Sequence, residues 1–163
     1  IKSKYDMDNL CVVSPDAGRV RLADMWTDKL GAPLAIIHKR RDPSKANQVA
    51  VHEVVGDVEG RTCLLVDDMI DTAGTITQAA QALRDRGAKR VIGAATHAIF
   101  SDPATERLNA SGMEEIIVTN TLPTTAHPDI HNLTVLSIAP LLARAIREVF
   151  LDGSVTSLFD GQA

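Results

Sequence analysis

The chain has 163 residues and a mass of 17.5 kDa, which suits one compact domain rather than two full-sized ones. Hydrophobic residues make up 45% and charged residues 23%, so the chain is expected to fold rather than stay disordered. The net charge is −4 and the only dense basic cluster is 39–41, so nucleic acid is not an expected partner. No apolar run reaches the roughly 18 residues that a membrane span needs, so no membrane partner is expected either.

The two cysteines, Cys11 and Cys63, both lie inside apolar, strand-like runs. Disulfides are rare in reducing compartments, so we expect two buried, reduced thiols in a cytoplasmic protein rather than a bridge. The chain starts at Ile1, with neither an initiator Met nor the apolar core of a signal peptide. We therefore expect a piece of a longer cytoplasmic chain.

Short β-rich runs alternate with helical patterns along the chain. Strands are expected over residues 9–14, 34–38, 49–55, 61–66, 91–96, 115–119 and 133–137. Helices are expected over 20–30, from about 75 to before 87, from 101–103 onward, and from 140 to 150. Gly31 is placed to cap the first helix, and the polar stretch 39–47 is expected to be a mobile loop.

This alternation predicts an α/β fold with a mostly parallel sheet and helices on both faces. Residues 49–66 are expected to form a β-hairpin insertion beside the flexible loop, because turn-forming residues 56–60 join two strand-like runs. Open sheets of this class bind ligands beyond the carboxyl ends of their strands. The loops at Asp16, Lys39, Asp67–Gly74 and Asn120 are therefore the candidate site.

The most informative segment is 64–76, Leu-Leu-Val-Asp-Asp-Met-Ile-Asp-Thr-Ala-Gly-Thr-Ile. A buried strand is expected to end at Asp67 and Asp68, and a short turn then leads into a helix. Residues 71–75 have what a phosphate site requires: free N–H groups at a helix start, small residues that allow close approach, and two threonine hydroxyls. Asp67 and Asp68 are expected to accept from sugar hydroxyls or to hold Mg²⁺ through water.

The segment 67–75 resembles the phosphoribosyl-pyrophosphate (PRPP) motif of type I phosphoribosyltransferases, and most closely that of the ribose-phosphate pyrophosphokinases, or PRPP synthetases. Residues 13–18 resemble the pyrophosphate loop of these synthetases, and 36–41 resemble their flexible catalytic loop. The similarity continues through 118–121 and 154–159. Three motifs in the family's order make the resemblance specific.

The resemblance implies transfer of the β,γ-pyrophosphoryl group of Mg-ATP to the C1 hydroxyl of ribose 5-phosphate, giving PRPP and AMP. Positioning and charge neutralisation dominate the catalysis of such transfers. Lys39 and Arg41 match the family's catalytic cations. The residues that match its ribose 5-phosphate site are Arg41, Asp67, Asp68, Asp71, Thr72, Ala73, Gly74 and Thr75.

Asp16, Ala17 and Gly18 match the family's pyrophosphate-binding residues, and Asp16 also matches a Mg²⁺ ligand, which makes Mg²⁺ the implied cofactor. Two positions depart from the family pattern. Arg19 stands where a second glycine is usual, and it either crowds the pyrophosphate loop or adds a cation to it. Ala73 stands where glycine is frequent, which is a mild change if its φ is negative.

The resemblance also implies a homo-oligomer, a hexamer in the full-length family, with phosphate or ADP acting at a regulatory site. Ser154, Thr156 and Phe159 match positions of that site. The family binds ATP chiefly through its N-terminal half, whereas residues 1–163 resemble the C-terminal domain alone. We therefore expect a phosphoribosyltransferase-like domain from a two-domain chain, which could be inactive by itself.

Two alternatives stay open. One is a phosphoribosyltransferase that consumes PRPP, which needs the same 67–75 motif but also a segment that selects the base; no segment looks large enough for that. The other is a non-catalytic regulatory subunit, which has no physical need for the site residues retained here.

Overall fold

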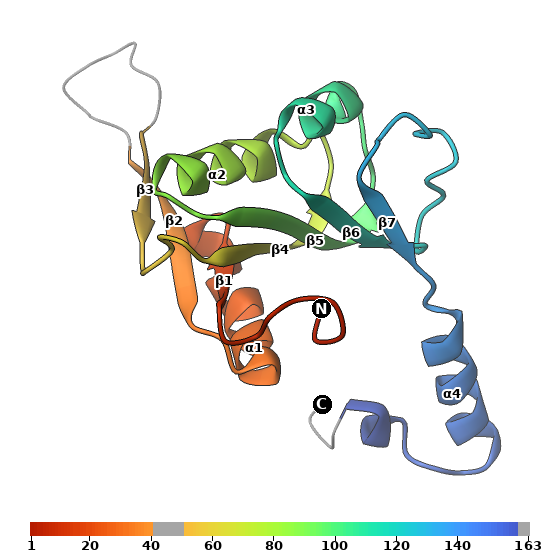
Figure 1. Ribbon diagram of the computed structural model, residues 1–163. Helices are drawn as coiled ribbons and strands as arrows, with labels where there is room; N and C mark the ends of the chain where they lie inside the picture. The colour runs from red at the N-terminus through yellow and green to blue at the C-terminus, as the bar shows by residue number, and fades with distance from the viewer. Residues whose placement is uncertain (41–50, 160–163) are drawn as a thin grey trace.

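The computed structural model describes residues 1–40 and 51–159, except for the side chains of residues 39, 40, 51 and 52. Its framework is a seven-stranded sheet in the order β3-β2-β1-β4-β5-β6-β7 (Figure 1). The strands are β1 (Leu10–Ser14), β2 (Leu34–Arg40), β3 (Val51–Val55), β4 (Thr62–Ile70), β5 (Arg90–Ala98), β6 (Glu115–Thr119) and β7 (Leu133–Leu136). Neighbouring strands are parallel except at β3, which runs antiparallel to β2 at one edge. The predicted α/β fold class is confirmed.

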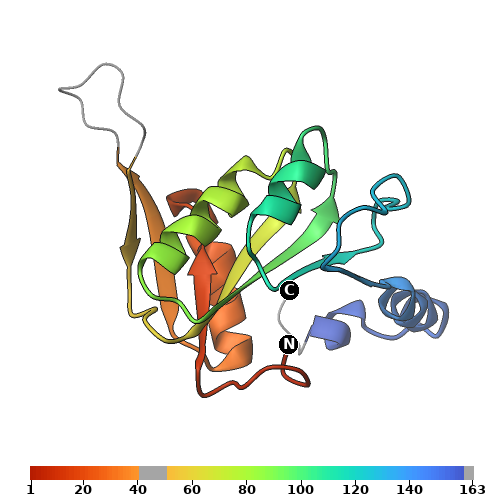
Figure 2. The same cartoon turned by 45° about the horizontal axis from the view of Figure 1, so that its top comes forward.

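Helices cover both faces of the sheet (Figures 1 and 2). Helices α2 (Gly74–Asp85) and α3 (Ala104–Ala110) lie on one face, and α1 (Val20–Leu30) lies on the other. Helix α1 ends where the sequence predicts, because Gly31 adopts a φ of 67° and donates its N–H to the carbonyl oxygen of Thr27 at 2.7 Å.

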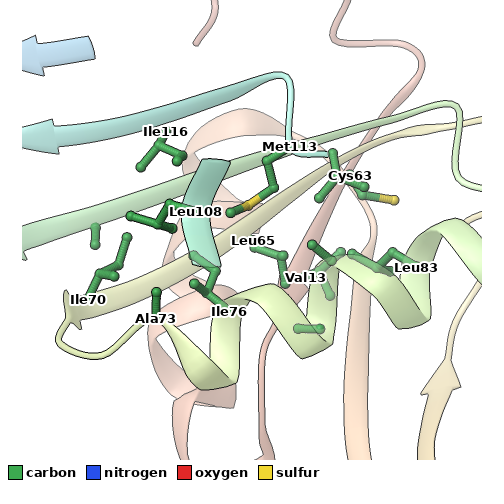
Figure 3. Close-up of a cluster of buried hydrophobic side chains, with 14 of the residues drawn as sticks. Val13, Cys63, Leu65, Ile70, Ala73, Ile76, Leu83, Leu108, Met113 and Ile116 are labelled. Carbon is green, nitrogen blue, oxygen red and sulfur yellow. The ribbon is translucent and has the colours of Figure 1, made fainter. Parts of the chain in front are cut away.

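Strand β4 is shared by two hydrophobic cores. Cys63 and Leu65 point into the larger core, beneath α2 and α3, and Figure 3 shows this cluster. Leu64 and Val66 point into the smaller core, beneath α1. Successive side chains of a strand face opposite sides of a sheet, so this uniformly apolar run is buried on both faces, as the composition predicts.

The cysteines are free and fully buried, as expected. Cys11 on β1 lies opposite Cys63 on β4 in the parallel register. Burial raises the pKa of the Cys11 thiol to about 11 and that of Cys63 to about 12. Both thiols are therefore protonated and act as small apolar side chains.

The hairpin has a different partner from the one predicted. Strand β3 pairs with β2, with His38 opposite Glu53, and not with β4. Strand β4 instead lies between β1 and β5 and runs on through the acidic pair to Ile70. The pairing of 49–55 with 61–66 was wrong because turn-forming residues between two strands indicate a reversal, not which strand becomes the neighbour.

The N-terminal segment is held against the start of β6. Lys4 Nζ lies 2.6 Å from Glu115 Oε1, and Tyr5 donates its hydroxyl hydrogen to Glu115 Oε2. Thr134 on β7 also donates to Glu115, at 2.5 Å. Burial alone would raise the pKa of Glu115, but these three donors outweigh it and lower the pKa to about 2.

The last elements are α4 (Ala139–Phe150) and the 3-10 helix η2 (Val155–Phe159), which stand clear of the sheet in both views (Figures 1 and 2). No residue of α4 is buried, and Ile146 and Phe150 expose 69% and 85% of their surface. Helix α4 therefore presents an apolar face that the described part of the chain leaves uncovered. Within the described ranges, no helix has the length and apolar character needed to cross a membrane.

Candidate functional site

A cavity of about 260 Å³ opens where β4 ends and α2 begins. Most of the residues predicted to bind a sugar phosphate line it. The lining residues are Asp67, Met69, Ile70, Asp71, Thr72, Ala73, Gly74, Thr75 and Ile76. The volume suits a small polar metabolite rather than a larger ligand.

The first turn of α2 forms one wall of the cavity. Its N-cap residue, Ala73, offers no side-chain acceptor, and the first backbone bond of the turn runs from Thr77 N–H to the Ala73 carbonyl oxygen at 3.1 Å. The N–H groups of Gly74, Thr75 and Ile76 therefore lack helical acceptors, and the positive end of the helix dipole points the same way. An anion in the cavity would accept hydrogen bonds from these N–H groups and interact favourably with the positive end of the dipole.

Ala73 adopts the left-handed conformation, with φ 60° and ψ 8°. The expectation of a mild change therefore fails, since it required a negative φ. The left-handed region costs an L-residue roughly 1–2 kcal/mol, whereas it costs glycine almost nothing. The Ala73 side chain is nonetheless buried in the larger core near Ile76, which offsets part of the strain (Figure 3).

Sequence reasoning missed Arg107 of α3. Its Nη1 donates to the carbonyl oxygen of Thr72 at 2.9 Å and lies 3.4 Å from where a Cβ on Gly74 would stand. Arg107 thus supports the cavity loop and brings a permanent positive charge to the uncapped helix start. No local motif marks this arginine, and only the packing of α3 beside α2 reveals it.

Arg19 bridges the acidic pair, of which Asp67 lines the cavity. Its Nε donates to Asp67 Oδ1 at 2.9 Å, and its Nη2 lies 2.9 Å from Asp68 Oδ1. The second contact has the distance of an ion pair without the alignment of a hydrogen bond, so the buried Asp68 Oδ1 keeps no hydrogen-bond partner among the described residues. The Arg19 guanidinium thus lies against the acidic pair, and its role at the pyrophosphate loop stays a prediction.

Asp67 is a perturbed carboxyl group. Burial is the main reason that its pKa rises to about 6, and the neighbouring Asp68 carboxyl group acts in the same direction. The Asp68 backbone N–H and the positive charge of Arg19 limit the rise. Perturbed carboxyl groups beside a cavity are typical of functional sites.

Asp16 caps the short 3-10 helix η1 (Ala17–Arg19) that follows β1. Its Oδ1 accepts the N–H groups of Gly18 at 2.7 Å and Arg19 at 3.1 Å, while Oδ2 has no partner in the described part of the chain. One hard carboxylate oxygen suits Mg²⁺, which commonly takes one or two carboxylates and completes its shell with water and phosphate oxygens. Within the described ranges, no three potential metal-ligating side chains gather at one point.

The other predicted residues lie outside this cluster or outside the described residues. Lys39 belongs to β2, but its side chain is not described, and Arg41 lies outside the described residues. Asn120 supports the chain instead, since its Oδ1 accepts the N–H of Ile138 at 2.9 Å. The residues expected in a regulatory site, Ser154, Thr156 and Phe159, lie at the far end of the chain and do not line the cavity.

Comparisons with known proteins agree with one another. The model of the phosphoribosyl synthetase-associated domain matches residues 44–160. The chain is 63% identical over 162 residues to a ribose-phosphate pyrophosphokinase of Streptomyces coelicolor, covering 99% of this chain and 50% of that protein. It is 59% identical over 164 residues to the Mycobacterium tuberculosis protein of that name, covering 100% and 50%. The chain thus spans about half the length of the curated relatives it matches.

Solved structures show the same similarity. The phosphoribosylpyrophosphate synthetase of Mycobacterium smegmatis superposes with a TM-score of 0.80 at 54% identity, covering 93% of this chain and 49% of that one. An orotate phosphoribosyltransferase of Aeropyrum pernix superposes with a TM-score of 0.55 at 18% identity, covering 86% and 67%. The second similarity extends to the fold alone.

Proposed function

The chain belongs to the phosphoribosyl synthetase-associated domain family, and on that premise we propose that it carries the sugar-phosphate half of a ribose-phosphate pyrophosphokinase. The proposed reaction moves the β,γ-pyrophosphoryl group of Mg-ATP to the C1 hydroxyl of ribose 5-phosphate, with PRPP and AMP as products. The names and identities of the curated relatives support this assignment.

One observation carries the proposal for the site: an uncapped helix start and the Asp67 carboxylate line one small cavity, and Asp68 directly follows Asp67. The α2 N-terminus, with the hydroxyls of Thr72 and Thr75, suits the 5-phosphate. Asp67 and Asp68 accept from the ribose hydroxyls, and Asp71 stands at the same loop. A sugar phosphate has both kinds of group, whereas free phosphate or free sugar would use only part of the cavity.

Asp16 and the backbone of Ala17 and Gly18 are proposed to bind the pyrophosphate. Mg²⁺ held through Asp16 Oδ2 would neutralise phosphate charge. Lys39 and Arg41 are proposed to place two cations against the transferred group, which is where phosphoryl transfer needs charge neutralised. Lys39 lies near the carboxyl end of β2, a strand beside β1, and this supports its role.

Residues 1–163 are proposed to be the C-terminal domain of a two-domain cytoplasmic chain, with ATP bound largely by the other half. The chain covers 50% of its curated relatives, which supports a missing partner half. The uncovered apolar face of α4 supports contact with that half or with another subunit of a homo-oligomer. Phosphate or ADP acting near Ser154, Thr156 and Phe159 belongs to the same proposal.

Titration of this chain with ribose 5-phosphate, followed by ³¹P NMR and calorimetry, tests the site. We expect ribose 5-phosphate to bind more tightly than either ribose or inorganic phosphate. Thr75→Val should weaken ribose 5-phosphate binding by about tenfold, because one hydrogen bond to a charged group is lost. Thr27→Val on α1 is the matched control and should leave the affinity unchanged.

Turnover is measured on the full-length protein with ATP, Mg²⁺ and ribose 5-phosphate. We expect Lys39→Ala and Arg41→Ala to reduce kcat strongly while the ribose 5-phosphate affinity changes little. Unchanged turnover in both variants contradicts the catalytic assignment. Equal affinity of this chain for ribose and ribose 5-phosphate contradicts the sugar-phosphate site.

A further inference from the structure

The guanidinium of Arg19 lies against two adjacent carboxylates, those of Asp67 and Asp68. Nε is 2.9 Å from Asp67 Oδ1 and Nη2 is 2.9 Å from Asp68 Oδ1, so one planar group meets both acids. The exposed fractions of the Asp67 and Arg19 side chains are 13% and 39%. The contact with Asp67 is therefore partly buried, and a partly buried charge pair is screened less than one at the surface.

In each of the two carboxylates, Arg19 contacts the Oδ1 atom and not the Oδ2 atom. Asp67 Oδ1 accepts from Arg19 Nε and also from the Asp68 backbone N–H at 2.8 Å. Asp68 Oδ1 is buried against Arg19 Nη2. The Oδ2 atom of each carboxylate has no hydrogen bond to the described residues, and Asp67 lines the cavity. Each acid thus turns one oxygen to Arg19 and keeps the other as an acceptor.

We infer that Arg19 is a resident cation that keeps divalent metal away from Asp67 and Asp68 and reserves their Oδ2 atoms for sugar hydroxyls. This inference rests on the proposed function for the nature of the ligand, but the exclusion of metal does not depend on it. An arginine keeps its charge at every relevant pH, so a divalent ion must either displace the guanidinium or bind beside a like charge. The sequence leaves both sugar and metal open for the acidic pair, and this inference favours the sugar.

Arg19 is a positioning residue rather than a catalytic one. Its backbone N–H is held by Asp16 Oδ1 at 3.1 Å while its side chain holds the acidic pair. The turn after β1 and the end of β4 are therefore joined through a single residue. Mg²⁺ at Asp16 and sugar hydroxyls at Asp67 and Asp68 would remain separate sites because Arg19 stands between them.

Manganese is the probe, and binding is counted by electron paramagnetic resonance on this chain without substrate. We expect Asp68→Asn to leave Mn²⁺ binding unchanged in the wild-type background, since Arg19 already excludes the ion. We expect Arg19→Gln to add a Mn²⁺ site or to tighten binding by about tenfold, and Arg19→Gln/Asp68→Asn to abolish that gain. Arg21→Gln, an exposed arginine two residues away, removes the same charge and should add no site.

Two results overturn the inference. Weaker Mn²⁺ binding by Asp68→Asn alone means that the acidic pair already holds metal, and this arm does not require any Arg19 variant to fold. A folded Arg19→Gln variant, checked by circular dichroism, that binds no more Mn²⁺ than Arg21→Gln means that Arg19 only stabilises the fold.

A ribose 5-phosphate titration of the wild-type chain separates this inference from the proposed function. If Arg19→Gln gains a Mn²⁺ site but the wild-type chain does not bind ribose 5-phosphate, the proposed function fails and the exclusion of metal stands. If ribose 5-phosphate binds and Arg19→Gln gains no metal site, the proposed function stands and the inference fails.

Discussion

Arg107 Nη1 donates a hydrogen bond to the carbonyl oxygen of Thr72, which joins α3 to the loop that begins α2. The two residues are 35 positions apart, and the bond places a cation beside unpaired N–H groups that face the cavity. Charge and backbone geometry at this wall therefore depend on one exposed side chain from another helix.

Replacing Arg107 should weaken anion binding. We expect Arg107→Ala to reduce the affinity for ribose 5-phosphate by about threefold to tenfold, because a charge near the phosphate and the brace on the loop are both lost. Calorimetric titration measures this, and Arg107→Lys should recover part of the affinity. Arg144→Ala on α4 removes the same charge far from the cavity. An Arg107→Ala affinity equal to that of Arg144→Ala would show that the bond has no role in binding.

Asp67 makes the fold less stable as the pH rises. Its pKa is about 6 in the folded chain, chiefly because of burial, and near 3.9 in an unfolded chain. The folded state therefore keeps a proton that the unfolded state has lost between these values, and stability falls as the pH rises through this window. We expect Asp67→Asn to unfold at a higher temperature than wild type at pH 7.5, by about 1 kcal/mol in stability, and to match it below pH 4.

Thermal melts followed by circular dichroism at both pH values measure the Asp67 effect. Asp24→Asn, on the exposed side of α1, is the control and should show no such pH dependence. An Asp67→Asn chain that melts below wild type at pH 7.5 would show that the contact with Arg19 outweighs the cost of burying the carboxylate.

Glu115, unlike Asp67, makes the fold less stable as the pH falls. Burial favours its neutral form, but the donors Lys4, Thr134 and Tyr5 outweigh burial and lower its pKa to about 2, from 4.5. Its contribution is present above pH 4.5 and is lost as the pH falls toward 2. We expect Glu115→Gln to cost about 1–3 kcal/mol at pH 7, because donors lose their charged acceptor, and to remove this part of the acid sensitivity.

Urea unfolding at pH 7 and at pH 3 tests the role of Glu115. Glu106→Gln, an exposed residue of α3, serves as the control. If Glu115→Gln and Glu106→Gln lose equal stability at pH 7, the attachment of the N-terminal segment contributes nothing measurable.

The strained backbone at Ala73 gives a comparison within one helix. Ala79→Gly, at a fully buried position inside α2, should cost about 1–2 kcal/mol from lost packing and helix propensity. Ala73→Gly loses a buried methyl group too, but glycine relieves the left-handed conformation. We expect the Ala73→Gly stability to lie within about 0.5 kcal/mol of wild type in urea unfolding. A loss as large as that of Ala79→Gly would mean that the φ of 60° carries no strain.

The sequence predicts the fold well where local chemistry decides it. Apolar runs without alternation mark the parallel strands, and Gly31 ends α1 as expected, because only a residue tolerant of positive φ suits that cap. The predicted end of β4 at residue 66 is wrong, because Asp67 and Asp68 have the composition of a turn but the strand continues to Ile70. They stay in the strand because β5 pairs alongside as far as Ala98, and pairing between distant strands has no local signal.

The candidate site is likewise predictable only in part. The segment 71–75 is recognisable from the sequence, because small and hydroxylic residues at a helix start are typical of a phosphate site. Arg107 and the double contact of Arg19 could not be predicted, since each depends on a long side chain reaching a residue 35 or 48 positions away. Charged side chains near a site are read from tertiary packing rather than from spacing.

Strand β4 belongs to both cores and leads without a break into the cavity, and this affects how the site can open. Leu64 and Leu65 are fully buried on opposite faces of the sheet, so freeing the strand exposes both cores together. Its amides should exchange with deuterium only through global unfolding, whereas those of α4, which has no buried residue, should exchange by local opening. A ligand held at Asp67 should slow exchange along the whole of β4, including Cys63 at the far end from the cavity.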